Sequence, residues 1–369
     1  MGHRLPRRSI LALAALTLPA GCATVHRAPA AASPSPAASS PSSSSSSSSS
    51  SAASASPTAA PSPSPSPSAS PSASAPPTPV HQATETDGRG GPVPFTPGRL
   101  MLGSYLALSG LSLSQSLALR RRQLGREQRI VHRFYPWDGY VPTSEPDVGK
   151  HSILMVSWHG ARYDQITNGA SDKLIASVAK KLAGMKRPIL LRWGWEMNGD
   201  WFEWAGSQNG QNPGAYVKAW RRIHGIFREH GATNVAWVWS PNWNSAPDAS
   251  WNRLQHYYPG DDHVDWVGVS GYDFYSETPA TLFTAVTEAY GGRKPLILSE
   301  TAAVDLGAHT KARWIRKLAT WAGKTPSLGA VVWFDTDTQE GTDHNFRPDT
   351  DADALAAYRA MVRADRFAG

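Results

Sequence analysis

The sequence predicts an α/β fold, a (β/α)8 barrel, over residues 91–369 of the 369-residue chain. Short apolar runs recur along this part, each followed by a polar, aromatic or acidic tip and then by a helical pattern. The runs do not alternate strictly between apolar and polar residues, which is typical of parallel strands covered on both faces. This part has the size of one barrel and holds all 15 tryptophans. In such barrels the active site lies in the loops after the strands.

Eight apolar runs are expected to be strands. They are residues 100–107, 129–135, 153–158, 188–192, 234–240, 264–270, 295–299 and 329–334. Helical patterns lie between them. They are residues 171–183, where Ser171-Asp172 forms the cap, 213–230, with Pro213 near its start, 311–321 and 351–363. The region 110–128 has weak caps, and a helix there could be broken.

Residues 1–22 have the features of an export signal. Three arginines near the start precede the apolar run 10–18, which ends in small residues. Arg7-Arg8 fits a twin-arginine signal, and an ordinary secretory signal fits equally well. Gly21-Cys22 resembles a bacterial lipoprotein box, in which Cys22 would be lipidated; simple secretion is the alternative. We expect an extracellular or cell-surface protein.

Residues 23–90 are expected to form a disordered linker. Their Ser, Pro and Ala residues offer little apolar surface to bury. Such a segment would serve as a tether between a lipidated Cys22 and the barrel.

Charge and cysteine content exclude several other functions. The net charge of +7 is spread along the chain, and the cluster at 120–122 is expected to be a solvated helix face, so no nucleic-acid partner is expected. Cys22 is the only cysteine, which leaves the barrel without a disulfide or a thiolate metal site. His132, His159 and His344 lack metal-ligand spacing. We expect no metal and no cofactor, no downstream membrane span, and a monomer.

Residues 192–204 carry the strongest functional signal. Glu196 lies among tryptophans just past the fourth expected strand, and Glu300 directly follows the seventh. These strands face each other across a barrel mouth, and a pair of carboxyls is what glycoside hydrolysis requires. The general acid must stay protonated, which apolar surroundings favour, whereas the nucleophile must stay ionised. Arg192 and Tyr272 are candidates to stabilise the nucleophile.

Two other acids are rivals for these roles. Asp273 follows the sixth strand and could be the nucleophile, and Glu203 could be the acid. Both are expected to be structural or exposed to solvent.

The segment 192–204 resembles the acid/base motif of glycoside hydrolase family 26, a family of retaining (β/α)8-barrel enzymes that includes β-mannanases. Further segments resemble the family in the same order: 236–242, 257–261, 264–268, 271–273, 294–301 and 331–335. The resemblance implies that Glu196 is the acid/base and Glu300 the nucleophile, hydrogen-bonded by Tyr272. It also implies substrate contacts from Trp333, as the platform under the sugar, and from Trp201, in the adjacent subsite. Arg192, Trp195 and Asn242 complete the expected substrate-binding set.

One residue departs from the family pattern. The family has His directly before the acid, whereas this chain has Trp195, whose indole offers one donor and no acceptor. The resemblance implies an endo-β-glycanase with mannan as the leading polysaccharide substrate, and Trp195 is the reason to keep β-glucan or xylan as alternatives. A carbohydrate-binding barrel with weakened catalysis is the rival function.

Overall fold

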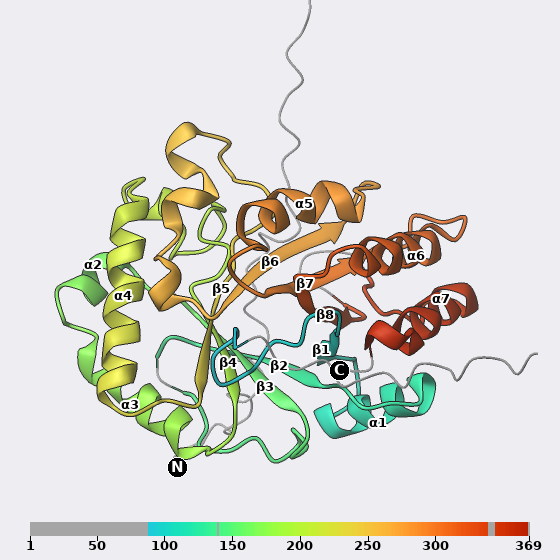
Figure 1. Cartoon of the computed structure of the whole chain (residues 1–369), viewed down its shortest axis with the longest axis horizontal. Coiled ribbons are helices and arrows are strands. Elements are labelled where there is room, and N and C mark those ends of the chain that lie inside the picture. The colour runs from blue at the N-terminus through green and yellow to red at the C-terminus, as the bar shows by residue number, and fades with distance from the viewer. Residues whose placement is uncertain (1–87, 139, 339–343, 368–369) are drawn as a thin grey trace, which may run out of the picture. The chain divides into compact units, whose positions relative to one another are not determined.

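The structure is a computed structural model that describes residues 88–138, 140–338 and 344–367. The expected export signal, Cys22 and residues 23–87 of the expected linker lie outside the described residues. The described part forms a closed barrel whose eight parallel strands follow chain order. The predicted (β/α)8 fold is confirmed (Figure 1).

All eight predicted strands are present. They are β1 Met101–Ala107, β2 Ile130–Tyr135, β3 Ile153–Trp158, β4 Ile189–Trp193, β5 Val235–Trp239, β6 Trp266–Asp273, β7 Leu296–Ala303 and β8 Leu328–Thr336. One boundary matters for function, because β7 continues past its predicted end and Glu300 lies inside the strand. The cause is continued pairing, since β6 and β7 stay in register as far as Asp273 and Ala303.

Helices surround the barrel. They are α1 Leu113–Leu124, α2 Tyr163–Thr167, α3 Asp172–Gly184, α4 Pro213–Glu229, α5 Pro279–Tyr290, α6 Thr310–Gly323 and α7 Ala352–Arg363. Short 3-10 turns add η2 Gly206–Gln208, η3 Ser250–Asn252, η4 Leu254–Tyr257, η5 Asp261–His263 and η6 Asp365–Phe367. In Figure 1, α3 and α4 lie on one flank of the barrel, and α1, α6 and α7 lie on the other.

Two expectations about helix caps need correction. The helix in region 110–128 is unbroken, because Ser112 and Gln115 form a reciprocal capping box and Gly125 ends the helix in the left-handed conformation. Ser171 does stand at the N-cap of α3, but its side chain makes no capping hydrogen bond.

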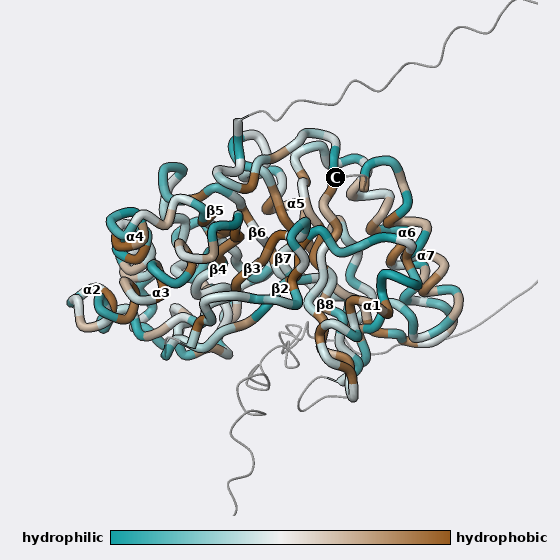
Figure 2. Tube along the Cα trace, turned by 90° about the horizontal axis from the view of Figure 1, so that it is seen from below, coloured by the Kyte–Doolittle hydropathy of each residue, from teal (hydrophilic) through white to brown (hydrophobic). Residues whose placement is uncertain are grey.

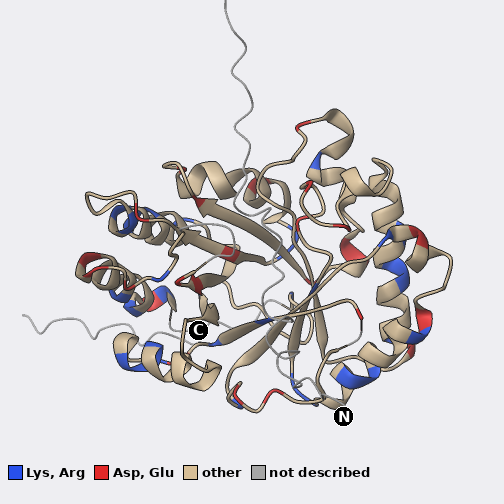
Figure 3. Ribbon diagram, turned by 180° about the vertical axis from the view of Figure 1, so that it is seen from behind, with Lys and Arg blue, Asp and Glu red and all other residues tan. Residues whose placement is uncertain are grey.

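The cluster at 120–122 is only partly a solvated face. Arg121 is 69% exposed, whereas Arg120 is 1% exposed and donates from Nε to Asp335 of β8 at 2.5 Å. This buried ion pair fixes α1 against the outside of the barrel. Lys and Arg lie on helices of both flanks of the barrel (Figure 3).

The interior of the barrel is filled in layers. Near the N-terminal ends of the strands, Trp266 packs with Phe95, and its indole N–H donates to the carbonyl groups of Gly90 and Val93. An apolar layer fills the barrel; it includes Ile130, Met155, Leu190, Val238, Ile297 and Val332. Figure 2 shows hydrophobic segments along the strands and hydrophilic ones at the periphery. Among the described residues, no helix is long and apolar enough to cross a membrane.

Candidate active site

Glu196 stands in a tight turn directly after β4. Gly194 and Glu196 both adopt left-handed backbone conformations, with φ of 51° and 53°. The turn is held because the Glu196 N–H donates to the carbonyl of Ser240 at 2.8 Å and its carbonyl accepts from Gly199 at 2.9 Å. A left-handed non-glycine residue costs about 1–3 kcal/mol, and such strain clusters at functional sites.

Glu300 is placed at the barrel mouth by an irregularity in β7. Against β8, the pairing jumps from Leu298 to Thr301, so that Ser299 and Glu300 lie within a bulge. Bulges re-aim side chains next to active sites. At this position Glu300 Oε2 accepts a hydrogen bond from the Tyr272 hydroxyl at 2.6 Å.

Arg192, on β4, connects the two acids. Its Nη1 donates to Glu300 Oε1, and its Nη2 lies 3.9 Å from Glu196 Oε1. Two serine hydroxyl groups also hold the Arg192 guanidinium group. Its Nη2 donates to Ser270 at 2.6 Å, and its Nη1 donates to Ser157 at 3.2 Å. One fully buried guanidinium group therefore contacts both carboxyl groups, although the acids are far apart in the chain.

Neither serine was singled out from the sequence. Ser270 could have been predicted from Tyr272. Both lie on β6, and residues two positions apart on a strand point to the same face. Ser157 carries no comparable signal, since nothing in its run shows which residues point inward.

Glu196 keeps its proton to a higher pH than an ordinary glutamate. Burial raises the pKa of Glu196 to about 7, and the negative charge of Glu300 adds to this effect, while Arg192 opposes it. Trp201 donates its indole N–H to Glu196 Oε2 at 2.9 Å. Oε1 has no hydrogen-bond partner among the described residues. Glu196 can thus offer a proton to a bound molecule from a fixed position.

The two rival acids, Glu203 and Asp273, stand in different surroundings. Glu203 is exposed. Asp273 accepts a hydrogen bond from the backbone of Ser276 at 2.8 Å, and burial raises its pKa to about 6.

In the described part of the chain, no group of three or more His, Cys, Asp or Glu side chains could hold a metal ion.

The family model described as "Glycosyl hydrolase family 26" matches residues 134–328. This chain belongs to glycosyl hydrolase family 26. The match covers both carboxyl groups and the arginine between them.

Curated relatives and solved structures agree with this family. "Endoglucanase H" of Acetivibrio thermocellus is 33% identical over 72% of this chain and 30% of its own length. "Mannan endo-1,4-beta-mannosidase A" of Piromyces is 31% identical over 34% of this chain and 18% of its own. The chain spans about a third of the length of the first curated relatives. A GH26 β-mannanase structure from Bacteroides ovatus aligns with a TM-score of 0.54 at 18% identity, covering 72% of this chain and 89% of that one; this similarity supports the fold.

Trp195, where the family resemblance implies a histidine, is a buried side chain next to Arg192. Its ring centroid lies 5.2 Å from that of Phe134 and 4.9 Å from that of Trp204. The guanidinium carbon of Arg192 lies 5.1 Å from the same ring. Trp195 therefore packs against Arg192 from one side as part of the buried surroundings of the two acids.

Trp333 does not lie where the family resemblance implied. Strand alternation points Val332 into the barrel, so Trp333 points outward, with 0% exposure, between Trp314 of α6 and Tyr358 of α7. Its indole N–H donates to the Phe346 carbonyl at 2.8 Å. The expected sugar platform at Trp333 is thus corrected: this side chain belongs to the outer core.

Phe334 takes the inward position on β8. Its ring lies 5.7 Å from that of Tyr272 and 4.8 Å from that of Tyr105. The sequence does not show that Phe334 faces inward, because Trp333 and Phe334 are adjacent and either side chain could point into the barrel.

Asn242 joins the loops after β4 and β5. Its backbone N–H donates to Asn198 Oδ1 at 2.8 Å, and Asn198 Nδ2 returns a bond to the Asn242 carbonyl at 3.0 Å. The Asn242 amide donates to Asn244 Oδ1 at 2.8 Å. Asn198, fully buried, was missed as a positioning residue although it stands two residues after Glu196.

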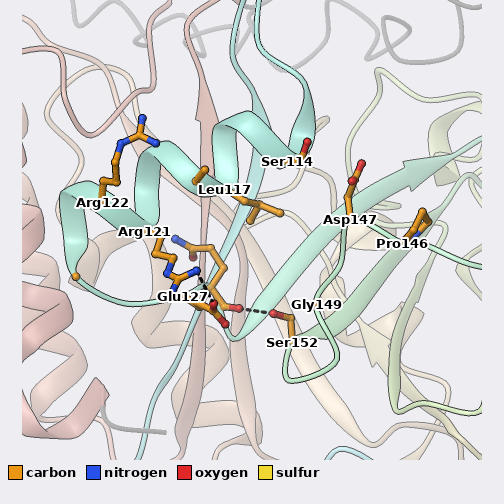
Figure 4. Close-up of a pocket in the computed structure, with 12 residues that line it drawn as sticks. Ser114, Leu117, Arg121, Arg122, Glu127, Pro146, Asp147, Gly149 and Ser152 are labelled. Atoms are coloured by element: carbon orange, nitrogen blue, oxygen red, sulfur yellow. Dashed lines mark hydrogen bonds and ion pairs between the residues drawn. The ribbon is translucent and has the colours of Figure 1, made fainter.

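A hollow of about 720 Å³ lies elsewhere, on the outside of the barrel between α1 and the segment before β3. Figure 4 shows Leu117 and Arg121 on one side and Asp147 and Ser152 on the other. The described part of the β2–β3 connection forms no helix there. This hollow contains neither Glu196 nor Glu300 and is not part of the candidate active site.

Proposed function

We propose that this chain is an endo-β-glycanase that hydrolyses a β-linked polysaccharide with retention at the anomeric carbon. The observation that carries the proposal is the arrangement of Glu196 and Glu300 around Arg192. Glu196, with its pKa raised to about 7, suits a general acid. Glu300, with donors from Arg192 and Tyr272, suits a carboxylate nucleophile.

The reaction follows from this arrangement in two steps. Glu300 attacks the anomeric carbon while Glu196 donates its proton to the glycosidic oxygen, and the leaving sugar departs with that proton. Glu196, now ionised, removes a proton from water, whose oxygen attacks the anomeric carbon; the bond from this carbon to Glu300 breaks, which frees the Glu300 carboxylate and releases the sugar. The carboxyl groups of retaining enzymes lie about 5–5.5 Å apart, and a single guanidinium group contacting both acids supports such a short separation.

Mannan is the leading substrate of this proposal. Support comes from the curated relatives, several of which are named mannan endo-1,4-β-mannosidases. β-Glucan is the second candidate, because Trp195 stands where the resemblance implies a histidine and a relative that matches 72% of this chain is named an endoglucanase. Xylan is the third candidate, because two relatives are named β-1,3-xylanases.

The test is reducing-sugar release by the chain from mannan, glucomannan, mixed-linkage glucan, carboxymethylcellulose and xylan. Glu196→Ala and Glu300→Ala are the controls. Release from one polymer that both variants lose supports the enzyme and identifies its substrate. Retardation of the wild type in a polysaccharide affinity gel without release from any polymer favours the carbohydrate-binding barrel instead.

We also propose that the chain is exported and anchored through Cys22. The support is sequence alone: the basic start, the apolar run and Gly21-Cys22. In a bacterial host, Cys22→Ser should move the protein from the membrane fraction to the soluble fraction. If wild type and variant are both soluble and exported, the protein is simply secreted.

A further inference from the structure

Two large exposed side chains emerge beside the strand that carries Glu300. Tyr275 follows β6 and is 65% exposed, and Leu306 follows β7 and is 51% exposed. The two strands pair as far as Asp273 and Ala303, and the Val304 N–H donates to the Asp273 carbonyl at 3.0 Å. The segments with Tyr275 and Leu306 therefore leave the barrel side by side, at the end where Glu300 lies.

The turn that carries Tyr275 is fixed by hydrogen bonds. One carboxylate oxygen of Glu277 accepts from the backbone N–H of Phe274 at 2.9 Å and from that of Tyr275 at 2.7 Å. Trp314 of α6 donates to the Glu277 carbonyl at 2.8 Å. Ser276 completes the turn in the left-handed region, with φ of 81°. Tyr275 is therefore presented to solvent by an ordered turn.

The segment with Leu306 is fixed in a similar way. The Leu306 N–H donates to the Thr310 hydroxyl at 2.8 Å, at the start of α6, and the Gly307 N–H donates to Asp305 at 3.0 Å. Both exposed side chains thus extend from backbones that are bonded on either side. Exposure of a single apolar side chain has little meaning alone. What sets these two apart is their place, on adjoining fixed segments that follow β6 and β7 at the end of the barrel where Glu300 lies.

Aromatic contacts link Tyr275 to the catalytic carboxyl. The Phe274 ring centroid lies 6.3 Å from that of Tyr275 and 5.5 Å from that of Tyr272, which donates to Glu300. The rings of Tyr272 and Tyr275 are therefore no more than about 12 Å apart. An oligosaccharide bound across Glu300 can reach this distance.

Resting on the proposed function, we propose that Tyr275 and Leu306 form an outer subsite for one pyranose ring of the polysaccharide. The apolar face of the ring would lie on the tyrosine, with its hydroxyl groups in water, since carbohydrate pockets combine apolar surface with few polar groups. This subsite would contact a sugar away from the cleaved bond. It would increase the affinity for oligosaccharides long enough to reach it and leave the affinity for shorter ones unchanged.

The experiment compares Tyr275→Ala and Leu306→Ala with wild type on two series, manno-oligosaccharides and cello-oligosaccharides of increasing length. The proposal expects kcat/KM for the longest oligosaccharides to fall about threefold to tenfold, the effect of one aromatic contact, and that for the shortest cleaved member to stay unchanged. Tyr275→Phe is the matched control and should retain wild-type values, because it keeps the ring. Unfolding temperatures check that each variant is folded.

An equal loss at every length would overturn the proposal, because it would show a disturbed catalytic centre. Unchanged rates at every length would also overturn it. If the wild type cleaves none of the oligosaccharides, the proposed hydrolase fails, and affinity gels containing mannan or mixed-linkage glucan decide the subsite separately. Retardation that Tyr275→Ala weakens supports the subsite, and retardation that it leaves unchanged, or none at all, overturns it.

Discussion

Arg192 and Glu300, 108 residues apart in the chain, form a buried ion pair at the barrel mouth. The same guanidinium group lies 3.9 Å from Glu196, so its position affects both acids of the proposed reaction. Ser157, Ser270 and Trp195 fix that position from three sides. Arg192 is thus the residue on which the geometry of the site depends.

Arg192→Met should lower kcat at least about 100-fold and destabilise the fold by about 3–5 kcal/mol. The reason is that the change leaves Glu300 buried without its partner. Denaturant unfolding and steady-state kinetics measure both effects. The double variant Arg192→Met/Glu300→Gln should be more stable than Arg192→Met alone, since it removes the unpaired charge. Equal stability of the two variants would contradict this account of the pair.

Trp201→Phe should shift the alkaline limb of the pH profile upward. The indole N–H of Trp201 bonds to the ionised form of Glu196, so its loss should raise a pKa that is already about 7. A general acid is active only when protonated, and the limb of kcat/KM follows its pKa in the free enzyme. Trp220→Phe, which loses an indole bond to His263 on the outer shell, is the control. A downward shift, or none, would show that the bond does not control protonation.

Glu196 should make the fold less stable as pH rises. Its pKa is about 7 in the folded chain against 4.5 for a free glutamate, so the folded state retains the proton that the unfolded state releases. Stability from this group is therefore full below pH 4.5 and falls up to about pH 7, by at most about 3 kcal/mol. Glu196→Gln should remove this dependence. Unfolding free energies of the two proteins, measured below, within and above this window, provide the test; parallel curves would refute it.

Trp333→Ala should act on stability and not on substrate binding. Its side chain is fully buried between α6 and α7, and removing a large core aromatic costs about 3–5 kcal/mol. KM should stay within about twofold of wild type at a temperature where the variant is folded. If the variant is stable and its KM is greatly raised, the prediction is wrong and Trp333 contacts the substrate.

The fold was predictable because most barrel strands are short, mainly apolar runs that recur along the chain with helical patterns between several of them. The predictions that were wrong concern features set by contacts between residues far apart in the chain. The length of β7 is set by its pairing with β6, and the buried state of Arg120 is set by Asp335 on the last strand. The unbroken helix in region 110–128 depends instead on a local signal, the capping box formed by Ser112 and Gln115.

The site was predictable where a residue type is hard to explain by packing. Glu196, Glu300, Arg192 and Tyr272 meet in one place, as four polar groups at strand ends suggest. Aromatic roles were not predictable, because Trp333 and Phe334 both suit a barrel strand and only three-dimensional alternation decides which faces the mouth. Ser157 was hidden for the same reason.

The most direct measurement is to trap the covalent intermediate. The chain would be incubated with a fluorinated β-glycoside that carries an activated leaving group and the sugar of the polymer it cleaves, and its peptides would then be analysed by mass spectrometry. The account predicts one glycosyl adduct, on the peptide that contains Glu300, and none in Glu300→Ala. An adduct on Asp273 or another residue, or substrate turnover with inversion and no adduct, would contradict it.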